Sequence, residues 1–429
     1  MEDASDALSS GPDAVIGFGP IRPAAGETAP PLRRQVLECV RSHGAIPRVD
    51  VAKHLAVSPA SVTVAVTELM ALGLVREVAA PSKPNGRGRP PVALSVEPSA
   101  GYVAGIKLSE PVSTAILTDF AGEPRSSVSV PASGVRSVHG LLDEAAHLLN
   151  TLIEKAACAP DAVQAVGLGL PGTVDYTAGE VLWSPILHTQ SVPLRRLASD
   201  RLGRPVEVDN DANLVTLAEL WFGAGRRLKD FAVITIEHGV GMGLVMDHQL
   251  HRGANRVGLE LGHTTVQIDG ALCRCGQRGC LEAYVSDYAL GREAATVLGE
   301  TVPGGEGQLA FLERLHDRAK AGDGPARDVF RRAGRYLALG IRNIISLYDP
   351  SAIILSGARL QFDFLYGDEV LSDIGPRRIH AGRVPKIEVN TWGDLVWARG
   401  AAALALDRLT ERMSTGHVGA ARMSAEVVK

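Results

Sequence analysis

Cysteine is scarce in this sequence, which has five cysteines among 429 residues. A disulfide-stabilised scaffold of this length would need more of them, spread along the chain. Three of the five instead fall between Cys273 and Cys280. This clustering excludes a disulfide framework and indicates a metal site in a protein of a reducing compartment.

Long apolar segments are missing as well. The longest runs, such as Ala401–Leu406, fall far short of the roughly 20 residues that a membrane-spanning helix requires. The sequence from Met1 to Asp6 is acidic where a secretory signal would be basic, and no apolar segment follows it. We therefore expect a cytoplasmic protein with no membrane partner.

A large excess of charge of one sign is also absent. The formal net charge of -4 argues against a protein that binds nucleic acid through charge alone. The charges are unevenly distributed, however, because residues 29–97 hold nine Lys or Arg and five Asp or Glu, a local net charge of 9 - 5 = +4. With 429 residues, of which 45% are hydrophobic, the chain can form two or three domains that each bury a core. The basic charge lies at one end of such a chain.

The N-terminal quarter of the chain has two parts. Residues 1–28 are rich in Gly, Pro, Ala, Ser and Asp and lack apolar periodicity, so we predict a flexible tail. Residues 29–97 then show three short helical patterns and two strand patterns, which we place at 32–43, 48–55, 59–72, 74–78 and 92–96. Pro47 and the Ser58-Pro59 pair mark helix starts, and Gly44 and Gly73 mark helix ends. This order predicts a winged helix-turn-helix domain.

A winged helix-turn-helix domain binds double-stranded DNA with the first turns of its third helix in the major groove. Here those turns carry small residues that can approach thymine methyl groups and phosphates, namely Ser58, Pro59, Ala60, Ser61 and Thr63. Arg87 and Arg89, in a Gly-Arg-Gly-Arg-Pro stretch between the strands, suit a narrow and strongly negative minor groove. The alternative is a generic three-helix interaction module followed by a solvated arginine-rich linker.

Residues 98–429 have the pattern of an α/β domain, because strand-like runs alternate with helix-like runs. The clearest strand-like runs lie at 102–108, 165–170, 231–236 and 352–355, and the clearest helix-like runs at 138–155 and 328–348.

Four residues between positions 263 and 280 are typical ligands of zinc, namely His263, Cys273, Cys275 and Cys280. One imidazole and three thiolates form a closed tetrahedral set, which predicts a structural zinc ion rather than a catalytic one with an open water position. Gly276 and Gly279 allow the tight turns that such a loop requires. The alternatives are buried free thiols or, with less support, a redox pair.

Four motifs of the chain carry a family resemblance. Gly258-Leu-Glu-Leu-Gly-His263 is followed by Cys273-x-Cys-Gly-x-x-Gly-Cys280-Leu-Glu282, and upstream lie Leu170-Pro-Gly172 and Asp209-Asn-Asp-Ala-Asn213. With these motifs the sequence resembles the ROK family (repressors, open reading frames, kinases), and specifically its winged-helix repressor branch. The resemblance extends from about residue 32 to residue 406.

The resemblance implies a two-lobed, actin-like (ribonuclease-H-like) sugar-kinase fold behind the DNA-binding domain, with a ligand cleft between the lobes. The positions that match the family's motifs imply a set of sugar ligands: Gly172, Asn210, Asp211, Glu260, His263 and Glu282. His263 would also hold the zinc ion through its other ring nitrogen. In the kinases the counterpart of Asp211 is the general base, although an Asp-Asn-Asp sequence equally suits a turn or a helix N-cap.

The sequence departs from the kinase members of the family where they bind the phosphates of ATP. The kinases have an Asp-x-Gly-Gly-Thr loop, whereas this chain reads Lys107-Leu108-Ser109-Glu110-Pro111. A lysine replaces the carboxylate, Glu110 repels phosphate, and Pro111 lacks an N–H donor. Glu237 adds a further negative charge just before the second phosphate loop of the kinases, whose glycines this chain keeps at positions 239, 241 and 243. These changes predict that the domain does not catalyse phosphoryl transfer.

Together these features predict a transcriptional regulator, most simply a repressor, that binds operator DNA and senses a sugar or sugar derivative in carbohydrate metabolism. Half-site geometry and the family resemblance imply a homodimer, or a tetramer. Two alternatives stay open: an active ATP-dependent sugar kinase with an accessory DNA-binding domain, and a regulator whose body binds a protein partner. Ile186 and Leu259 depart from residues usual in the family and weaken the sugar assignment.

Overall fold

The structure is a computed structural model. It describes residues 17–22, 30–79, 92–132, 134–255, 257–303, 307–357, 367, 374, 384–390 and 392–414.

Three helices and a two-stranded antiparallel sheet form a small unit that we call the head. Its elements are α1 (Leu32–His43), α2 (Arg48–Leu55), α3 (Pro59–Ala71), β1 (Val75–Ala79) and β2 (Val92–Val96). The helices begin where the sequence predicts, because Ser58 Oγ accepts a hydrogen bond from Ser61 N and Pro59 occupies the first turn of α3. The apolar face of α3 is buried, and its residues Val62, Val66 and Leu69 have no exposed surface.

Residues 98–414, which we call the body, contain two five-stranded sheets in the part that the structure describes. The first sheet has the order β5 (Pro124–Pro131), β4 (Val112–Asp119), β3 (Tyr102–Lys107), β6 (Val163–Leu170) and β9 (Val206–Asn210). The helices α4 (Val138–Ala156) and α5 (Leu194–Leu202) bury their apolar residues in one core with this sheet. The small hairpin of β7 (Thr173–Asp175) and β8 (Glu180–Trp183) follows β6.

The second sheet repeats the pattern of the first. Its order is β12 (Gln249–His251), β11 (Val240–Met246), β10 (Phe231–Ile236), β13 (Ala352–Ser356) and β14 (Lys386–Val389). In both sheets the first two pairings are antiparallel and the last two are parallel. This duplication confirms the two lobes of an actin-like fold. Further helices extend the second lobe: α7 (Glu282–Val285), α8 (Asp287–Leu298), α9 (Gly307–Lys320) and α10 (Gly324–Tyr348).

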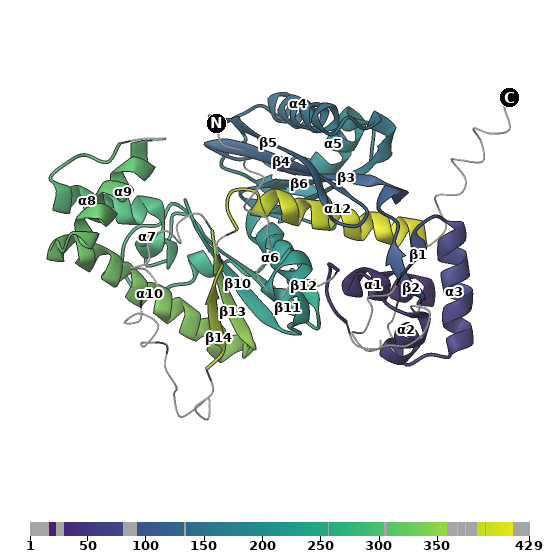
Figure 1. The fold of residues 1–429 in the computed structure, drawn as a ribbon. Coiled ribbons are helices and arrows are strands. Elements are labelled where there is room, and N and C mark those ends of the chain that lie inside the picture. Colours follow the sequence, from purple (N-terminus) through teal and green to yellow (C-terminus); the bar gives the residue numbers. More distant parts are fainter. Residues whose placement is uncertain are drawn as a thin grey trace.

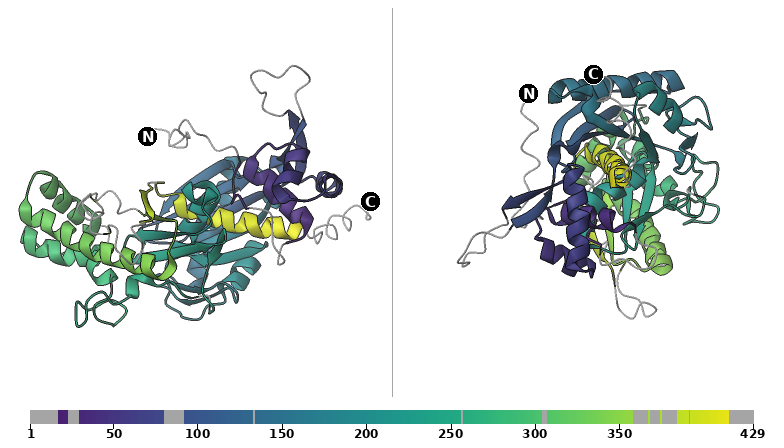
Figure 2. Two further views of the ribbon diagram at one scale, coloured as in Figure 1. Left: turned by 90° about the horizontal axis from the view of Figure 1, so that it is seen from below. Right: turned by 90° about the vertical axis from the view of Figure 1, so that its right-hand side faces the viewer.

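Two helices lie between the sheets, α6 (Asp211–Phe222) and α12 (Val396–Ser414). Figure 1 shows α12 running from the middle of the body to the head, and the right-hand view of Figure 2 shows it passing between the lobes. Glycines let this helix approach its neighbours closely. A Cβ on Gly400 would lie 1.8 Å from the carbonyl oxygen of Leu214 in α6, and one on Gly105 in β3 would lie 2.0 Å from that of Ala398.

The prediction of a flexible tail is wrong for residues 17–22. Their backbone is hydrogen-bonded to both parts of the molecule, since Phe18 N donates to Arg41 O in the head and Gly19 N donates to Trp221 O in the body. The ring of Phe18 is buried and stacks on Phe222 at a centroid distance of 6.0 Å. An isolated aromatic residue between two glycines gave no periodic signal, so only the tertiary contact reveals its place.

Among the described residues, none of the helices by itself has both the length and the hydropathy to cross a membrane. The helices α2 and α3 meet both requirements only when they are counted together, across a bend of 117°.

Candidate functional site

The first group of predicted ligand residues lies at one edge of the first sheet. The strands β3, β6 and β9 are parallel, with Lys107 paired to Gly169 and Leu170 paired to Asn210. Because the carboxyl ends of parallel strands meet at the same edge, Lys107, the Pro171-Gly172 turn and Asn210 come together there. Gly172 has a φ of +120°, and a Cβ at this position would lie 2.2 Å from Trp183 O, so the turn requires glycine.

Asn210 and Asp211 occupy the start of α6. Asn210 is the N-cap, and its Oδ1 accepts a hydrogen bond of 2.8 Å from Asn213 N. Asp211 is the first helical residue, and burial raises the pKa of its carboxyl to about 6. Lys107 opposes this rise, whereas Glu237 and Glu260 add to it. Asn210 therefore serves a capping role, and Asp211 is held near several other charges.

Glu260, His263 and Glu282 approach the same region from the second lobe. Desolvation raises the pKa of Glu260; His263 opposes this rise and Glu282 adds to it. Glu282 Oε2 accepts a hydrogen bond of 3.4 Å from Val240 N, at the start of β11. Since Glu260 also acts on Asp211, the structure brings the predicted carboxylates of both lobes within electrostatic reach of one another. We call Asp211, Glu260 and Glu282 the carboxylate cluster.

The residue before Glu260 carries backbone strain. Leu259 has a φ of +74°, in the left-handed region that favours glycine. In the family that the sequence resembles, this position usually carries glycine, which adopts such a φ without strain, so Leu259 departs from the pattern at a strained position. Ile186, the other departure from that pattern, is 3% exposed and lies in the core of the first lobe with Leu187. Its side chain therefore belongs to the packing of that lobe.

Lys107 connects the two lobes at the place where the kinases have a carboxylate. Its Nζ lies 3.7 Å from Glu237 Oε2, which follows β10 of the second sheet. The same Nζ lies 3.5 Å from the ring centroid of Trp397, in the first turn of α12, which is a cation–π contact. Glu237 is therefore paired with Lys107, a partnership that the separate sequence motifs did not indicate.

The second contact that sequence reasoning missed holds the start of α6 in place. Arg252 forms two hydrogen bonds to Asp209 Oδ2, of 2.9 Å from Nε and 2.6 Å from Nη2. Asp209 is 1% exposed, and its Oδ1 also accepts a hydrogen bond from Asn213 Nδ2. Two charge-assisted hydrogen bonds from one guanidinium to one carboxylate oxygen restrict geometry as well as pairing the charges. The signal in the sequence was Asp209 itself, a carboxylate at the end of a buried strand, which requires a cationic partner.

The four predicted metal ligands lie together beside the carboxylate cluster. The ligand atoms of His263, Cys273, Cys275 and Cys280 all lie within 4.8 Å of one another and could hold a metal ion. Cys273 Sγ lies 3.6 Å from His263 Nδ1, and Cys275 Sγ lies 3.7 Å from Cys280 Sγ. The hydroxyl of Tyr288 lies 3.5 Å from Cys273 Sγ.

The predicted DNA-contacting residues at the start of α3 lie on the surface of the head, whereas the carboxylate cluster belongs to the body. Pro59, Ala60 and Thr63 are exposed, and so is Ser58. Ser58 and Ser61 share a hydrogen bond of 2.8 Å between their hydroxyls, so part of their hydrogen-bonding capacity serves the helix N-terminus. Arg87 and Arg89 lie outside the described residues.

Comparisons with known proteins relate the body to one protein family, to a xylose repressor and to a glucokinase. The sequence profile described as the ROK family matches residues 103–408. The xylose repressor of Caldicellulosiruptor bescii is 29% identical, over 86% of this chain and 94% of the repressor. The glucokinase of Streptomyces griseus, solved with glucose and AMPPNP, is 31% identical with a TM-score of 0.59, over 72% of this chain and all of the kinase.

A third relative extends the structural likeness to the head. A ROK family transcriptional regulator described as a homologue of the Escherichia coli protein Mlc matches with a TM-score of 0.73. The match covers 90% of this chain and 97% of that structure, at 24% identity. At this identity the match bears on the fold alone, and its extent includes residues outside the family profile.

Proposed function

This chain belongs to the ROK family, and from that premise we propose that it is a DNA-binding transcriptional repressor whose body binds a sugar or sugar derivative without phosphorylating it. The observation that carries the proposal is the combination of a head like that of a winged helix-turn-helix with a Lys107–Glu237 ion pair in the body. Xylose repressors among the relatives support the same function.

DNA binding is assigned to the head, as a winged helix-turn-helix domain of residues 29–97. The exposed first turn of α3 carries Pro59, Ala60 and Thr63, and the strands β1 and β2 form the hairpin whose connection contains Arg87 and Arg89. Small residues allow close approach to base edges, and the two arginines add charge for the minor groove. The partner is a palindromic operator bound by a homodimer, because the two half-sites of such an operator require two heads.

Sugar binding is assigned to Gly172, Asn210, Asp211, Glu260, His263 and Glu282. Carboxylates and an amide can accept and donate hydrogen bonds to adjacent hydroxyls, which suits a polyol. The raised pKa of Asp211 and Glu260 supports this assignment, since groups that are partly desolvated and close together are typical of binding sites. A buried polar site of this kind also rejects analogues that lack a hydroxyl.

The surroundings of Lys107 support the proposal that the body does not transfer phosphoryl groups. In a kinase this region must accommodate the phosphates of magnesium-ATP, and positioning and charge neutralisation supply most of the catalysis. Here the Lys107 ammonium is engaged by Glu237 and by the face of Trp397. No carboxylate stands at position 107 to bind magnesium, and the charge of Lys107 is already neutralised by a residue of the second lobe.

The metal is assigned as one structural zinc ion held by His263, Cys273, Cys275 and Cys280. A tetrahedral zinc ion, with bonds of about 2.3 Å to sulfur and about 2.0 Å to nitrogen, keeps its ligand atoms roughly 3.5 to 3.8 Å apart. The separations of 3.6 Å and 3.7 Å between ligand atoms fit this requirement. Zinc would stabilise the loop that positions His263 and Glu282 beside the candidate sugar site.

The test of DNA binding begins with operator selection, in which the full chain captures fragments from genomic DNA and the bound sequence is identified. Its dissociation constant is then measured at several salt concentrations, with and without a panel of neutral sugars. We expect one sugar to change operator affinity by about tenfold or more. Replacing Arg87 and Arg89 by Ala should weaken binding and lower the salt slope by about 2, since each positive charge placed against the DNA releases about one counterion.

Arg201→Ala is the matched control, because Arg201 lies on the surface of the body in α5 and pairs with Asp143. Unchanged affinity and salt slope in the Arg87 and Arg89 variant would contradict the proposed minor-groove contact. If no DNA is captured at all, the assignment of the head as a DNA-binding domain is wrong.

The second candidate function, a sugar kinase, is favoured by the glucokinases among the relatives. A coupled assay with magnesium-ATP and a panel of hexoses distinguishes the two. We expect no turnover above background, and turnover at ordinary kinase rates, about 1 per second or faster, would overturn the assignment as a non-catalytic regulator. If the body binds tightly to a protein and no sugar of the panel binds, the effector is a protein partner in place of a sugar.

A further inference from the structure

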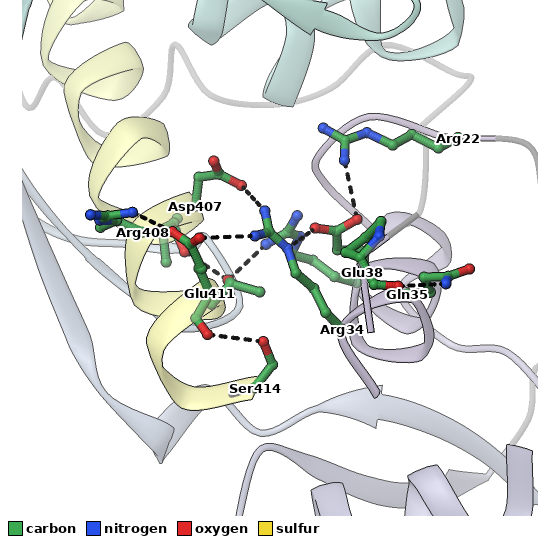
Figure 3. A network of polar contacts seen from close by, with 12 residues as sticks. Arg22, Arg34, Gln35, Glu38, Asp407, Arg408, Glu411 and Ser414 are labelled. Atoms are coloured by element: carbon green, nitrogen blue, oxygen red, sulfur yellow. Dashed lines mark hydrogen bonds and ion pairs between the residues drawn. The ribbon is translucent and has the colours of Figure 1, made fainter. Parts of the chain in front are cut away.

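The head is fixed to the body by a polar network between α1 and the end of α12 (Figure 3). Arg34 of α1 is central to it. Its guanidinium lies 2.8 Å from Glu38 Oε1, 3.2 Å from Asp407 Oδ1 and 3.8 Å from Glu411 Oε1. Arg33 Nε donates to the carbonyl oxygen of Ser414, the last residue of α12. The last turns of α12 therefore hold one face of α1.

Arg41, two turns further along α1, is buried between the head and two helices of the body. It is 3% exposed, its Nη1 donates a hydrogen bond of 3.0 Å to Thr410 Oγ1 in α12, and its guanidinium lies 4.1 Å from the ring centroid of Trp221 in α6. A buried guanidinium that stacks on an aromatic ring is held in one geometry. Arg41 therefore contacts both helices that lie between the lobes.

Residues 17–22, which we call the strap, contact both Arg41 of α1 and Trp221 of α6. Phe18 N donates to Arg41 O, and Gly19 N donates a hydrogen bond of 2.6 Å to Trp221 O. The ring of Phe18 lies 6.1 Å from that of Trp221 and 5.6 Å from the Arg41 guanidinium. Arg226, just after α6, donates to the carbonyl oxygens of Gly19 in the strap and Ser42 in the head. The strap thus ties the C-terminal end of α6 to α1.

The other end of α6 is the candidate sugar site. The helix begins at Asp211 of the carboxylate cluster and ends at Phe222, next to Trp221. Twelve residues of α-helix span about 18 Å, and a helix that is packed along its length moves as a rigid element. The backbone contact of Gly400 with Leu214 keeps α6 and α12 in register with each other. A shift at Asp211 is therefore carried to Trp221.

The geometry points to a mechanical connection between the candidate sugar site and the head, formed by α6 and the strap, in which Arg41 is the positioning residue that transmits movement of α6 to α1. The inference rests on the proposed function, because it takes the carboxylate cluster as the ligand site. Ligand that binds one position of Asp211 better than another shifts α6, and the contact of Trp221 with Arg41 and Phe18 turns that shift into a change in the orientation of α3.

Hydrogen–deuterium exchange of the full chain tests the connection, because different peptides report the two ends. Residues 206–216 report on the sugar site, and residues 33–46 report on α1. The proteins compared are wild type, Arg41→Met, Phe18→Ala and the control Arg48→Met, and the probes are D-glucose, D-xylose and N-acetyl-D-glucosamine. Methionine fills much of the space of a buried arginine without leaving an unpaired charge. Arg48 pairs with Glu77 within the head.

A sugar that slows exchange of residues 206–216 should change exchange of residues 33–46 by about threefold or more in wild type and in Arg48→Met. In Arg41→Met and Phe18→Ala the sugar should still protect 206–216 but leave 33–46 unchanged. The connection is overturned if 33–46 responds equally in all four proteins, or does not respond in wild type while 206–216 is protected. Phe18→Ala keeps the test decisive if Arg41→Met does not fold.

If none of the three sugars protects residues 206–216, the failure concerns the proposed ligand and not the connection. Asp211→Asn is then introduced into each of the four proteins in place of sugar binding, since it removes a charge at the start of α6. Exchange of 33–46 should shift in wild type and in Arg48→Met and stay constant in the other two. A shift in all four backgrounds, or in none, would overturn the connection.

Discussion

Asp211 lies in an environment that differs strongly from that of an ordinary surface carboxylate. Burial raises its pKa from 3.8 to about 6, and the nearby Lys107 ammonium only partly offsets this effect. The folded protein therefore holds a proton on Asp211 at pH values where the unfolded chain has released it. A group of this kind destabilises the folded state when it is ionised, as expected for the proposed role of Asp211 in binding.

Replacing Asp211 by Asn should make the free energy of unfolding less dependent on pH. In wild type the contribution of Asp211 falls as pH rises from about 4 to about 6, because the unfolded chain binds fewer protons than the folded one in that window. Asp211→Asn should therefore gain roughly 2 to 3 kcal/mol over wild type between pH 4 and pH 7. Urea unfolding at pH 4 and at pH 7 measures the difference in the free energy of unfolding between the variant and wild type. Asp143→Asn is the control, because Asp143 lies on the surface. An equal difference at both pH values would refute the prediction.

The cysteines of the proposed zinc site make a second prediction at this scale. Cys275→Ser should reduce bound zinc from about one ion per chain and destabilise the body by several kcal/mol, because a structural zinc site contributes its binding energy to folding. Metal analysis by mass spectrometry together with thermal unfolding measures both effects. Cys158→Ser is the matched control, since Cys158 is a free cysteine outside the cluster. Full zinc content in the Cys275 variant would contradict the ligand set.

At the scale of elements, α12 decides how the lobes and the head are related. It packs against β3 and β6 of the first sheet and against α6, and its last turns bind α1. Sequence periodicity places helices and strands individually, but it does not predict which surfaces they share. The glycines at positions 105 and 400 look unremarkable in the sequence, and only the packed structure shows that backbone atoms occupy the space of their missing side chains.

Gly400→Ala should destabilise the protein by about 3 kcal/mol, because the added methyl group would overlap the carbonyl oxygen of Leu214 and push α12 away from α6. Gly324→Ala, in the first turn of α10, is the control, since its Cβ would meet nothing within 4 Å. The two variants make the same chemical change in a helix, and their midpoints of urea unfolding are compared. Similar midpoints would show that the contact between α6 and α12 is not tight in solution.

At the scale of the whole molecule, the head and the body share a continuous hydrophobic core. Leu37 and Val40 of α1 belong to the same buried cluster as Trp221 of α6 and Leu409 of α12. Figure 1 shows the head at one end of α12, with α8, α9 and α10 at the opposite end of the molecule. The head is therefore fixed against the body in the described structure, which suits a regulator whose ligand site must influence a distant DNA-binding surface.

The head expressed alone, as residues 30–97, should be less stable than the same residues in the full chain. Separation exposes apolar surface of α1 and removes the partners of Arg41, a loss of about 3 kcal/mol or more. Urea unfolding of the isolated head, compared with hydrogen exchange of the same peptides in the full chain at matched urea concentrations, measures the difference. Equal stability in the two settings would show that the interface with the body contributes nothing to the head.

The sequence by itself determined the features that depend on local chemistry. Caps at Ser58 and Pro59, glycine stops and alternating patterns predicted the elements of the head and the main strands, and the spacing from His263 to Cys280 predicted the metal ligands, which the structure brings together. These signals are local because a cap, a turn or a metal loop is formed by residues close in the chain.

The tertiary structure alone decided the contacts between residues that are distant in the chain. Three contacts join segments that are more than 40 positions apart: Lys107 with Glu237 and Trp397, Arg252 with Asp209, and Gly19 of the strap with Trp221. The sequence does not show which residue a lysine, an arginine or a phenylalanine will contact when that residue is distant in the chain. Their roles follow from packing, which places one end of α6 at the candidate sugar site and the other end against the head.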